Sequence, residues 1–272
     1  SENLYVIEAN PRASRTVPFV SRATGVQMAK AAVLIGLGKS IAELKSEGYL
    51  PSNMDGASLP EETAIAVKAA VLPFARFRTP EGVVVDSLLS PEMRSTGEVM
   101  GLDKHYDTAF AKAQAGAGSP LPTSGKVFIS VANHDKRNVI IYAKMLESLG
   151  FEIVSTGGTA EILRRNGLNS VIVASKFAEA NGDHSIVDMV RNGDIDLILN
   201  TPAGGAARSD GYEIRAAAVS VGCPVMTTIS EFAAAVQAIN ALREHSWDIM
   251  SLQEHGVQLA AAVDARSEGG EA

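Results

Sequence analysis

Residues 126–245 alternate short apolar runs with segments of helical periodicity, and this pattern restricts the fold more than any other feature of the chain. The apolar runs span residues 126–132, 151–155, 170–174, 196–200 and 224–229. The helical stretches lie near residues 136–149, 159–166, 185–192, 211–221 and 230–244. Strands that alternate with helices form right-handed crossovers and a parallel sheet covered on both faces. The pattern therefore predicts an α/β, Rossmann-like domain with a parallel five-stranded sheet.

Three loops that follow the predicted strands carry polar residues suited to binding an anion. They span residues 133–137, 155–159 and 200–205. In open parallel sheets, ligands bind beyond the carboxyl ends of the strands, where such loops meet. The sequence therefore predicts a ligand site at this edge of the sheet.

The second of these loops opens a predicted helix and is suited to a phosphate group. Gly157 and Gly158 allow the backbone to approach a ligand closely. The unpaired N–H groups and the positive dipole end of a helix start both attract an anion. Thr156 and Thr159 add hydroxyl donors, and Lys136 on the neighbouring loop adds a positive charge. This combination favours a phosphate monoester over a dinucleotide.

Two of these residues also have ordinary structural interpretations. Thr159 could serve only as the N-cap of its helix, because threonine is a common N-cap residue. Lys136 could be a solvated lysine at a helix start. The prediction of a site therefore depends on the three loops meeting at one edge, rather than on either residue alone.

The amino-terminal segment carries a second cluster of polar residues. On an extended strand over residues 4–10, Glu8 and Asn10 lie on one face, roughly 7 Å apart. Their oxygens can then reach one hard cation such as Mg²⁺. Arg12 and Arg15 follow with donors suited to phosphate. The alternative is an edge strand whose Glu and Asn are ordinary surface residues.

The run Asn-Pro-Arg-Ala-Ser-Arg-Thr-Val-Pro-Phe-Val-Ser at residues 10–21 resembles the second ATP-grasp half of carbamoyl phosphate synthetase large subunits. The similarity continues through residues 23–25, 38–40, 71–74 and 91–101. The resemblance implies a ligase that makes carbamoyl phosphate from bicarbonate, ammonia and ATP for pyrimidine and arginine biosynthesis. It implies a glutaminase small subunit as partner, and a half-subunit that phosphorylates carbamate. By this resemblance the chain is a C-terminal fragment of such a subunit.

The same resemblance implies roles for the amino-terminal cluster. Glu8 and Asn10 would hold Mg²⁺ or Mn²⁺ that bridges the ATP phosphates, and Arg12 and Arg15 would be the catalytic residues that stabilise the transferring phosphoryl group. A near-octahedral Mg²⁺ shell needs more ligands than two residues supply. We therefore expect this chain alone to bind neither metal nor ATP tightly in its truncated ATP-grasp part, and to lack synthetase activity.

Residues 126–245 resemble the methylglyoxal-synthase-like domain through Thr-Gly-Gly-Thr-Ala at 156–160, Leu-Arg-Arg-Asn-Gly at 163–167 and Asn-Thr at 200–201. In the synthetase large subunits this domain binds allosteric nucleotides, UMP as inhibitor and IMP as activator. One further family lysine matches Lys176 when one residue is inserted, and one family threonine position is occupied by Pro202. The resemblance implies allosteric nucleotide binding by Lys136, Thr156, Gly157, Gly158, Thr159, Lys176, Asn200 and Thr201.

Two further expectations follow from relatives of this domain. One relative is a phosphate lyase that uses aspartates near the phosphate loop, so a stand-alone methylglyoxal-synthase-like enzyme is the alternative function, with Asp183 beside His184 as its candidate. Enteric relatives bind ornithine through two acidic residues, but this chain has Ala69 and Met226 at those positions. We therefore expect ornithine binding to be weak or absent, because a cation without partners binds poorly.

Composition and the linker-forming residues complete the predicted domain organisation. The run of small residues and prolines at 119–125 predicts a linker between an ATP-grasp portion, 1–118, and the allosteric domain, 126–260, with a disordered tail at 261–272. A net charge of −7 argues against nucleic-acid binding, and no apolar run approaches the roughly 18 residues of a membrane span. The single cysteine and the polar start favour a cytoplasmic protein. We also expect a homo-oligomer.

Overall fold

The computed structural model describes residues 6, 8–52, 63–77, 85–89, 92–175, 185–201, 204–244, 247–258 and 261. The chain divides into two compact units: Ser1–Ile65 with Ile249–Ala272, and Ala66–Asp248. No helix among the described residues has the length and hydropathy needed to cross a membrane.

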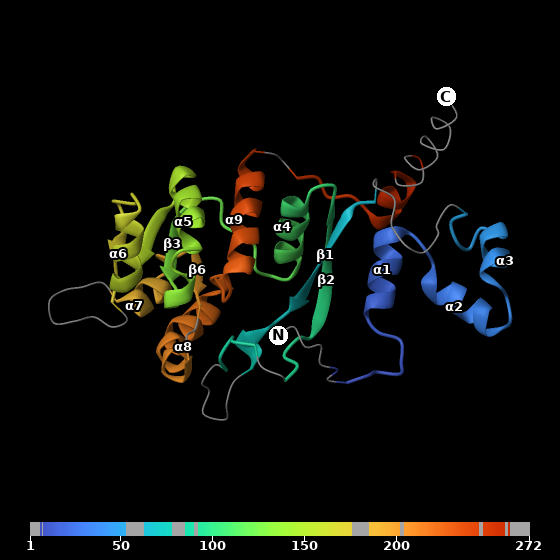
Figure 1. Cartoon of the computed structure of the whole chain (residues 1–272), viewed down its shortest axis with the longest axis horizontal. Helices are drawn as coiled ribbons and strands as arrows, with labels where there is room; N and C mark the ends of the chain where they lie inside the picture. The colour runs from blue at the N-terminus through green and yellow to red at the C-terminus, as the bar shows by residue number, and fades with distance from the viewer. Residues whose placement is uncertain are drawn as a thin grey trace. The chain divides into compact units, whose positions relative to one another are not determined.

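The second unit contains the predicted parallel sheet, so the predicted α/β fold class is confirmed. Its strands run in the order β5-β4-β3-β6-β7, and Figure 1 labels the neighbouring strands β3 and β6 at the centre of this sheet. In the central pairs, Ile129 lies beside Ser155 and Ser130 beside Asn200, so these strands end at one common edge. The strands are β3 (Lys126–Ser130), β4 (Glu152–Ser155), β5 (Ile172–Val173), β6 (Leu197–Asn200) and β7 (Val225–Met226).

Helices cover both faces of this sheet, because its strands are apolar on both sides. Val127 and Ile129 pack with α5 (Val139–Ser148), α6 (Gly157–Arg165) and α9 (Ile229–Glu244) in one core. Phe128, between them on β3, packs on the opposite face with α7 and α8. The bounds of these two helices are Ile186–Arg191 and Gly204–Val221. Residues pointing alternately to two buried layers explain why the strands read as continuous apolar runs.

The same unit contains a two-stranded sheet that the sequence did not predict. It pairs β1 (Ile65–Val71) with β2 (Gly97–Asp103). Three alanines and a lysine dilute the apolar signal of β1, and these residue types are depleted in strands. The 3₁₀ turn η1 (Phe74–Arg76) follows β1 and contacts α8. Tertiary contacts, rather than the local sequence, therefore determine that these segments form strands.

The alanine-rich stretch at residues 103–115 predicts a short helix, and α4 (Tyr106–Gly116) confirms it. Helix α4 packs between β2 and α9, and Figure 1 shows α4 beside α9. Its Phe110 and Ala111 belong to the same core as α5, α6 and α9. Leu121, within the predicted linker, is also buried in this core. The division of the chain at residues 119–125 stays a prediction, but this segment packs against the fold.

Within its described residues, the first unit has the short helices α1 (Thr16–Thr24), α2 (Met28–Gly36) and α3 (Ile41–Ser46), and residues 252–258 are also helical. The helical spacing of Val26, Ala29 and Val33 predicts one helix over residues 23–36. This prediction is wrong, because α1 ends and α2 begins within that range. Gly25 adopts φ +73°, the left-handed conformation that commonly ends a helix. Glycine at this position therefore separates the two helices.

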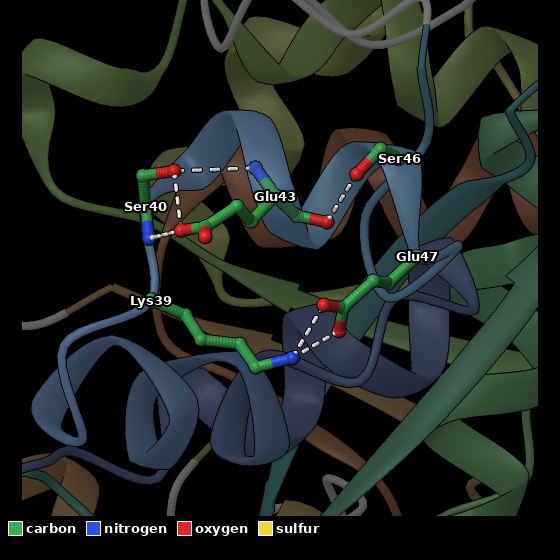
Figure 2. Close-up of polar contacts among 5 residues, drawn as sticks. All are labelled: Lys39, Ser40, Glu43, Ser46 and Glu47. Carbon is green, nitrogen blue, oxygen red and sulfur yellow. Dashed lines mark hydrogen bonds and ion pairs between the residues drawn. The ribbon is translucent and has the colours of Figure 1, made fainter.

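Helix α3 is only six residues long and depends on its ends for stability. Figure 2 shows its capping box, in which the amide of Glu43 donates to Oγ of Ser40 and the amide of Ser40 donates to the Glu43 carboxylate. The same view shows Lys39 paired with both carboxylate oxygens of Glu47. The capping hydrogen bonds of Ser40 lower the pKa of the Glu43 carboxyl below its usual value, because they favour its charged form.

The strand predicted over residues 4–10 is wrong for the residues that the structure describes there. Val6, Glu8, Ala9 and Asn10 have no regular secondary structure. A strand is defined by its ladder of hydrogen bonds to a neighbour, and no described segment pairs with these residues. The alternation of residue types in the sequence predicts which residues share a face, but it cannot show that a neighbouring strand is present.

Candidate functional site

The carboxyl edge of the five-stranded sheet brings the three predicted loops together through hydroxyl groups. Oγ of Ser130 lies 3.3 Å from Oγ1 of Thr156, which joins the ends of β3 and β4. The amide of Ala132 donates to Oγ1 of Thr201 over 2.9 Å, which joins β3 to the loop after β6. The predicted convergence of loops at this edge is therefore present.

The start of α6 faces this edge and has the features of an anion site. Thr156 is the N-cap residue but makes no side-chain capping bond, and its hydroxyl lies instead near Ser130. The first N–H groups of a helix have no acceptor within the helix, so those of Gly157 and Gly158 are available to a ligand. Both glycines are exposed. The helix start therefore presents donors to solvent rather than to protein.

Lys136 lies beside the start of α6. A Cβ atom added to Gly158 would lie 3.4 Å from Nζ of Lys136. The ammonium group therefore adds a full positive charge to the partial positive charge of the helix end. Within the described part of the chain, no carboxylate lies within ion-pair distance of this lysine.

Thr159 does not have the N-cap role that was its ordinary interpretation. It lies inside α6, is 2% exposed, and its Oγ1 accepts from the amide of Val131 at 3.5 Å. This long contact ties the β3 loop to the helix. The hydroxyl of Thr159 thus belongs to the internal framework of the site.

A buried charged residue that the sequence did not predict supports the third loop. The guanidinium of Arg215 on α8 is fully buried. It donates to Oδ1 of Asn200 at 2.8 Å and binds both carboxylate oxygens of Asp86 at 2.7 Å. A Cβ atom on Gly211, one turn earlier, would lie 2.5 Å from Oδ1 of Asn200. Glycine at 211 therefore leaves the space in which the guanidinium and the amide meet.

The sequence carried one local signal of this arrangement. A glycine such as Gly211 inside a helix costs about 1 kcal/mol relative to alanine, so it indicates a close approach by another group. Nothing local identifies the approaching group, because Asp86 lies 129 residues from Arg215.

The residues predicted to hold metal and phosphate at the amino terminus are exposed and make few contacts with one another. Nδ2 of Asn10 donates to Oε1 of Glu8 at 3.0 Å, and both residues are exposed. Arg12 and Arg15 are exposed as well. No group of three or more acidic, His or Cys side chains able to hold a metal occurs among the described residues. Glu8 and Asn10 thus fit only part of a Mg²⁺ shell, and no catalytic step is derived from them.

Several predicted residues lie outside the described part of the chain. They are Lys176, the candidate lyase residues Asp183 and His184, and Pro202. The disordered tail predicted from residue 261 also lies outside it, apart from Ala261 itself.

Cys223 is half-buried and serves packing rather than chemistry. Its thiol donates to the carbonyl of Ile195 at 3.4 Å. Burial, and then the negative charge of Asp196, raise the pKa of the thiol from its ordinary value of 9.0 to about 12. Thiolate is the reactive form, so this cysteine is a poor nucleophile.

We expect iodoacetamide at pH 8 to alkylate Cys223 about 1,000-fold more slowly in the native chain than in the denatured chain, because the raised pKa removes the thiolate. The chain has a single cysteine, so the mass of the intact protein reports the reaction directly. Equal rates in the native and denatured chains would contradict the expectation.

Comparisons with known proteins agree with the fold. The model of the MGS-like domain matches residues 138–227, and the model of the carbamoyl-phosphate synthase L chain ATP binding domain matches residues 1–44. A carbamoyl phosphate synthase large chain of Kocuria rhizophila is 69% identical over 94% of this chain and 23% of its own length. Those of Paenarthrobacter aurescens and Streptomyces griseus are 63% and 55% identical over 97% and 96% of this chain, and 24% of each relative.

The chain thus spans about a quarter of the length of the relatives it matches. Both halves of the resemblance found in the sequence are confirmed, since one family model matches at the amino terminus and the other covers most of the parallel sheet. The chain belongs to the family of carbamoyl phosphate synthase large chains.

Proposed function

We propose that this chain is the part of a carbamoyl phosphate synthase large chain that binds a regulatory nucleotide. The observation that carries the proposal is the position of Lys136 beside the open start of α6. A lysine ammonium and free helix amides together recognise a phosphate group. UMP and IMP, the effectors implied by the resemblance, both carry such a phosphate.

The rest of the proposed site is arranged around that phosphate position. Thr156 presents a hydroxyl at the same loop. Asn200 and Thr201, which are nearly buried, border it from the end of β6. The Nδ2 group of the Asn200 amide, for which the described residues show no acceptor, is a donor suited to a ribose or a base. The site therefore combines a charged end with a neutral polar end, as a nucleoside monophosphate requires.

We further propose that the whole large chain makes carbamoyl phosphate with ATP, with Mg²⁺ or Mn²⁺ held partly by Glu8 and Asn10, and with a glutaminase small subunit as partner. Within it, Arg12 and Arg15 would contact the transferring phosphoryl group. The chain alone would lack this activity, because the described residues supply only part of a metal site. Weak ornithine binding also stays a prediction: Ala69 carries no charge, and Met226 is apolar and buried.

We expect UMP or IMP to bind the wild-type chain in isothermal titration calorimetry, and Lys136→Ala to weaken that binding at least 10-fold. Charge-assisted hydrogen bonds contribute roughly 1.5–3 kcal/mol, which corresponds to this loss. Lys126→Ala is the matched control, since Lys126 begins β3 at the opposite end of the strand and pairs with Glu152. Unchanged affinity in Lys136→Ala, or equal losses in both variants, would refute the site.

The same preparations distinguish the alternative function. A methylglyoxal-synthase-like enzyme would release inorganic phosphate from dihydroxyacetone phosphate, and we expect no release above the level of buffer. Sustained release that depends on Lys136 would favour the lyase instead.

A further inference from the structure

Arg215 holds one residue of the proposed nucleotide site and one residue outside the MGS-like match at the same time. Asn200 ends β6 within that match, whereas Asp86 lies in the segment 85–89 that precedes it. We propose that Arg215 is a positioning residue that orients Asn200 toward the ligand and couples occupancy of the site to Asp86. This inference rests on the proposed function of the sheet edge.

Arg215 fixes the orientation of the Asn200 side chain. A guanidinium group only donates hydrogen bonds, so the atom of Asn200 that faces Arg215 at 2.8 Å is the amide oxygen. The Nδ2 group must then lie on the other branch of the planar amide. The backbone that follows is also held, because Thr201 accepts from Ala132. Arg215 therefore selects one of the two faces that Asn200 can present to a ligand.

Asp86 in turn fixes the orientation of Arg215. Both oxygens of Asp86 bind its planar fork at 2.7 Å, through Nε and one terminal nitrogen, which leaves the other terminal nitrogen for Asn200. Such a bidentate pair fixes the plane of the guanidinium. The missing Cβ of Gly211 gives this plane its space. Asp86 thus determines, through Arg215, where the Asn200 amide points.

The segment that carries Asp86 is itself hydrogen-bonded to Asp86 and to Phe77. The amide of Leu88 donates to Oδ1 of Asp86 at 3.1 Å, and the amide of Val85 donates to the carbonyl of Phe77 at 3.0 Å. Phe77 immediately follows η1, which contacts α8. A change at the Asp86 carboxylate is therefore transmitted to backbone outside the MGS-like match, and binding at Asn200 affects that carboxylate by the same amount in return.

A buried ion pair can also be purely structural, and that alternative predicts different behaviour. A structural pair would affect stability but leave the ligand affinity unchanged. The pair of Lys112 with Asp103 is a matched comparison, since it also has a 2.7 Å contact and side chains that are 15% and 20% exposed. It joins α4 to β2, and the hydrogen bonds of Lys112 within the described residues go to Leu102 and Asp103, outside the proposed site.

The test compares Asp86→Asn with Asp103→Asn in the full chain. We expect Asp86→Asn to weaken UMP binding about fivefold in calorimetry, because a loosened Arg215 lowers the fraction of Asn200 amides held in the competent orientation. We expect Asp103→Asn to change it less than twofold. The side-chain ¹H–¹⁵N resonances of Asn200 should shift without ligand in Asp86→Asn and stay in place in Asp103→Asn.

Each outcome decides the proposal. Wild-type binding with equal affinities and unshifted Asn200 resonances in both variants would overturn the coupling and leave the proposed function intact. Absence of UMP and IMP binding in the wild type would overturn the proposed function and the coupling together. If Asp86→Asn does not fold, Asp86→Glu replaces it. Glutamate retains the charge but shifts the guanidinium of Arg215, so weaker UMP binding and shifted Asn200 resonances are again expected.

Discussion

Replacing Arg215 with methionine is expected to lower the free energy of unfolding by roughly 3–5 kcal/mol. The guanidinium is fully buried and satisfies the carboxylate of Asp86 and the amide oxygen of Asn200. Methionine fills much of the same volume but removes the guanidinium donors from both acceptors, and losing the partner of a buried charge or amide is costly. Denaturation in urea, followed by circular dichroism, measures the loss.

Two further variants separate the cause of this loss. Arg191→Met is the surface control, because Arg191 is 61% exposed and lies 3.8 Å from Asp188, and exposed pairs contribute about 0–1 kcal/mol. The double variant Asp86→Leu with Arg215→Met should be more stable than Arg215→Met alone, since no carboxylate is then left without its guanidinium. A double variant as unstable as the sum of its single changes would contradict this explanation.

Gly101→Ala is expected to destabilise the second unit by roughly 4 kcal/mol or more. A Cβ atom at this position of β2 would lie 2.6 Å from the backbone nitrogen of Ala113 and well inside contact distance of the carbonyl oxygen of Ala109. Both atoms belong to the backbone of α4, so no side-chain rotation relieves the overlap. The helix must move away from the strand, and Phe110 and Ala111 would leave the core with it.

A second glycine on the same strand provides the control. A Cβ atom on Gly97 would meet only Cγ2 of Val71, at the ordinary distance of 4.0 Å. Gly97→Ala should therefore change stability by about 0.5 kcal/mol or less. Thermal denaturation of the two variants in parallel measures the difference, and similar melting temperatures would show that α4 and β2 are not packed as closely as the structure has them.

The comparison of sequence with structure shows which kinds of feature are local. The five parallel strands were predictable because each is an apolar run flanked by helical periodicity, and burial on both faces requires such runs. The strands β1 and β2 were not, because alanine, lysine and glycine carry no strand signal until a neighbour supplies the ladder. The break between α1 and α2 was not predictable from hydrophobic periodicity, because it depends on the left-handed conformation of the single residue Gly25.

The sequence by itself determined the family, the parallel α/β fold and the loops that meet at the carboxyl edge of the sheet, because motifs and periodicity are contained in short stretches of chain. Only the tertiary structure decided how those loops are held. The ion pair of Arg215 with Asp86 and the contact of Gly101 with α4 join residues from different elements. Their energies depend on burial and distance, which no local pattern of residues specifies.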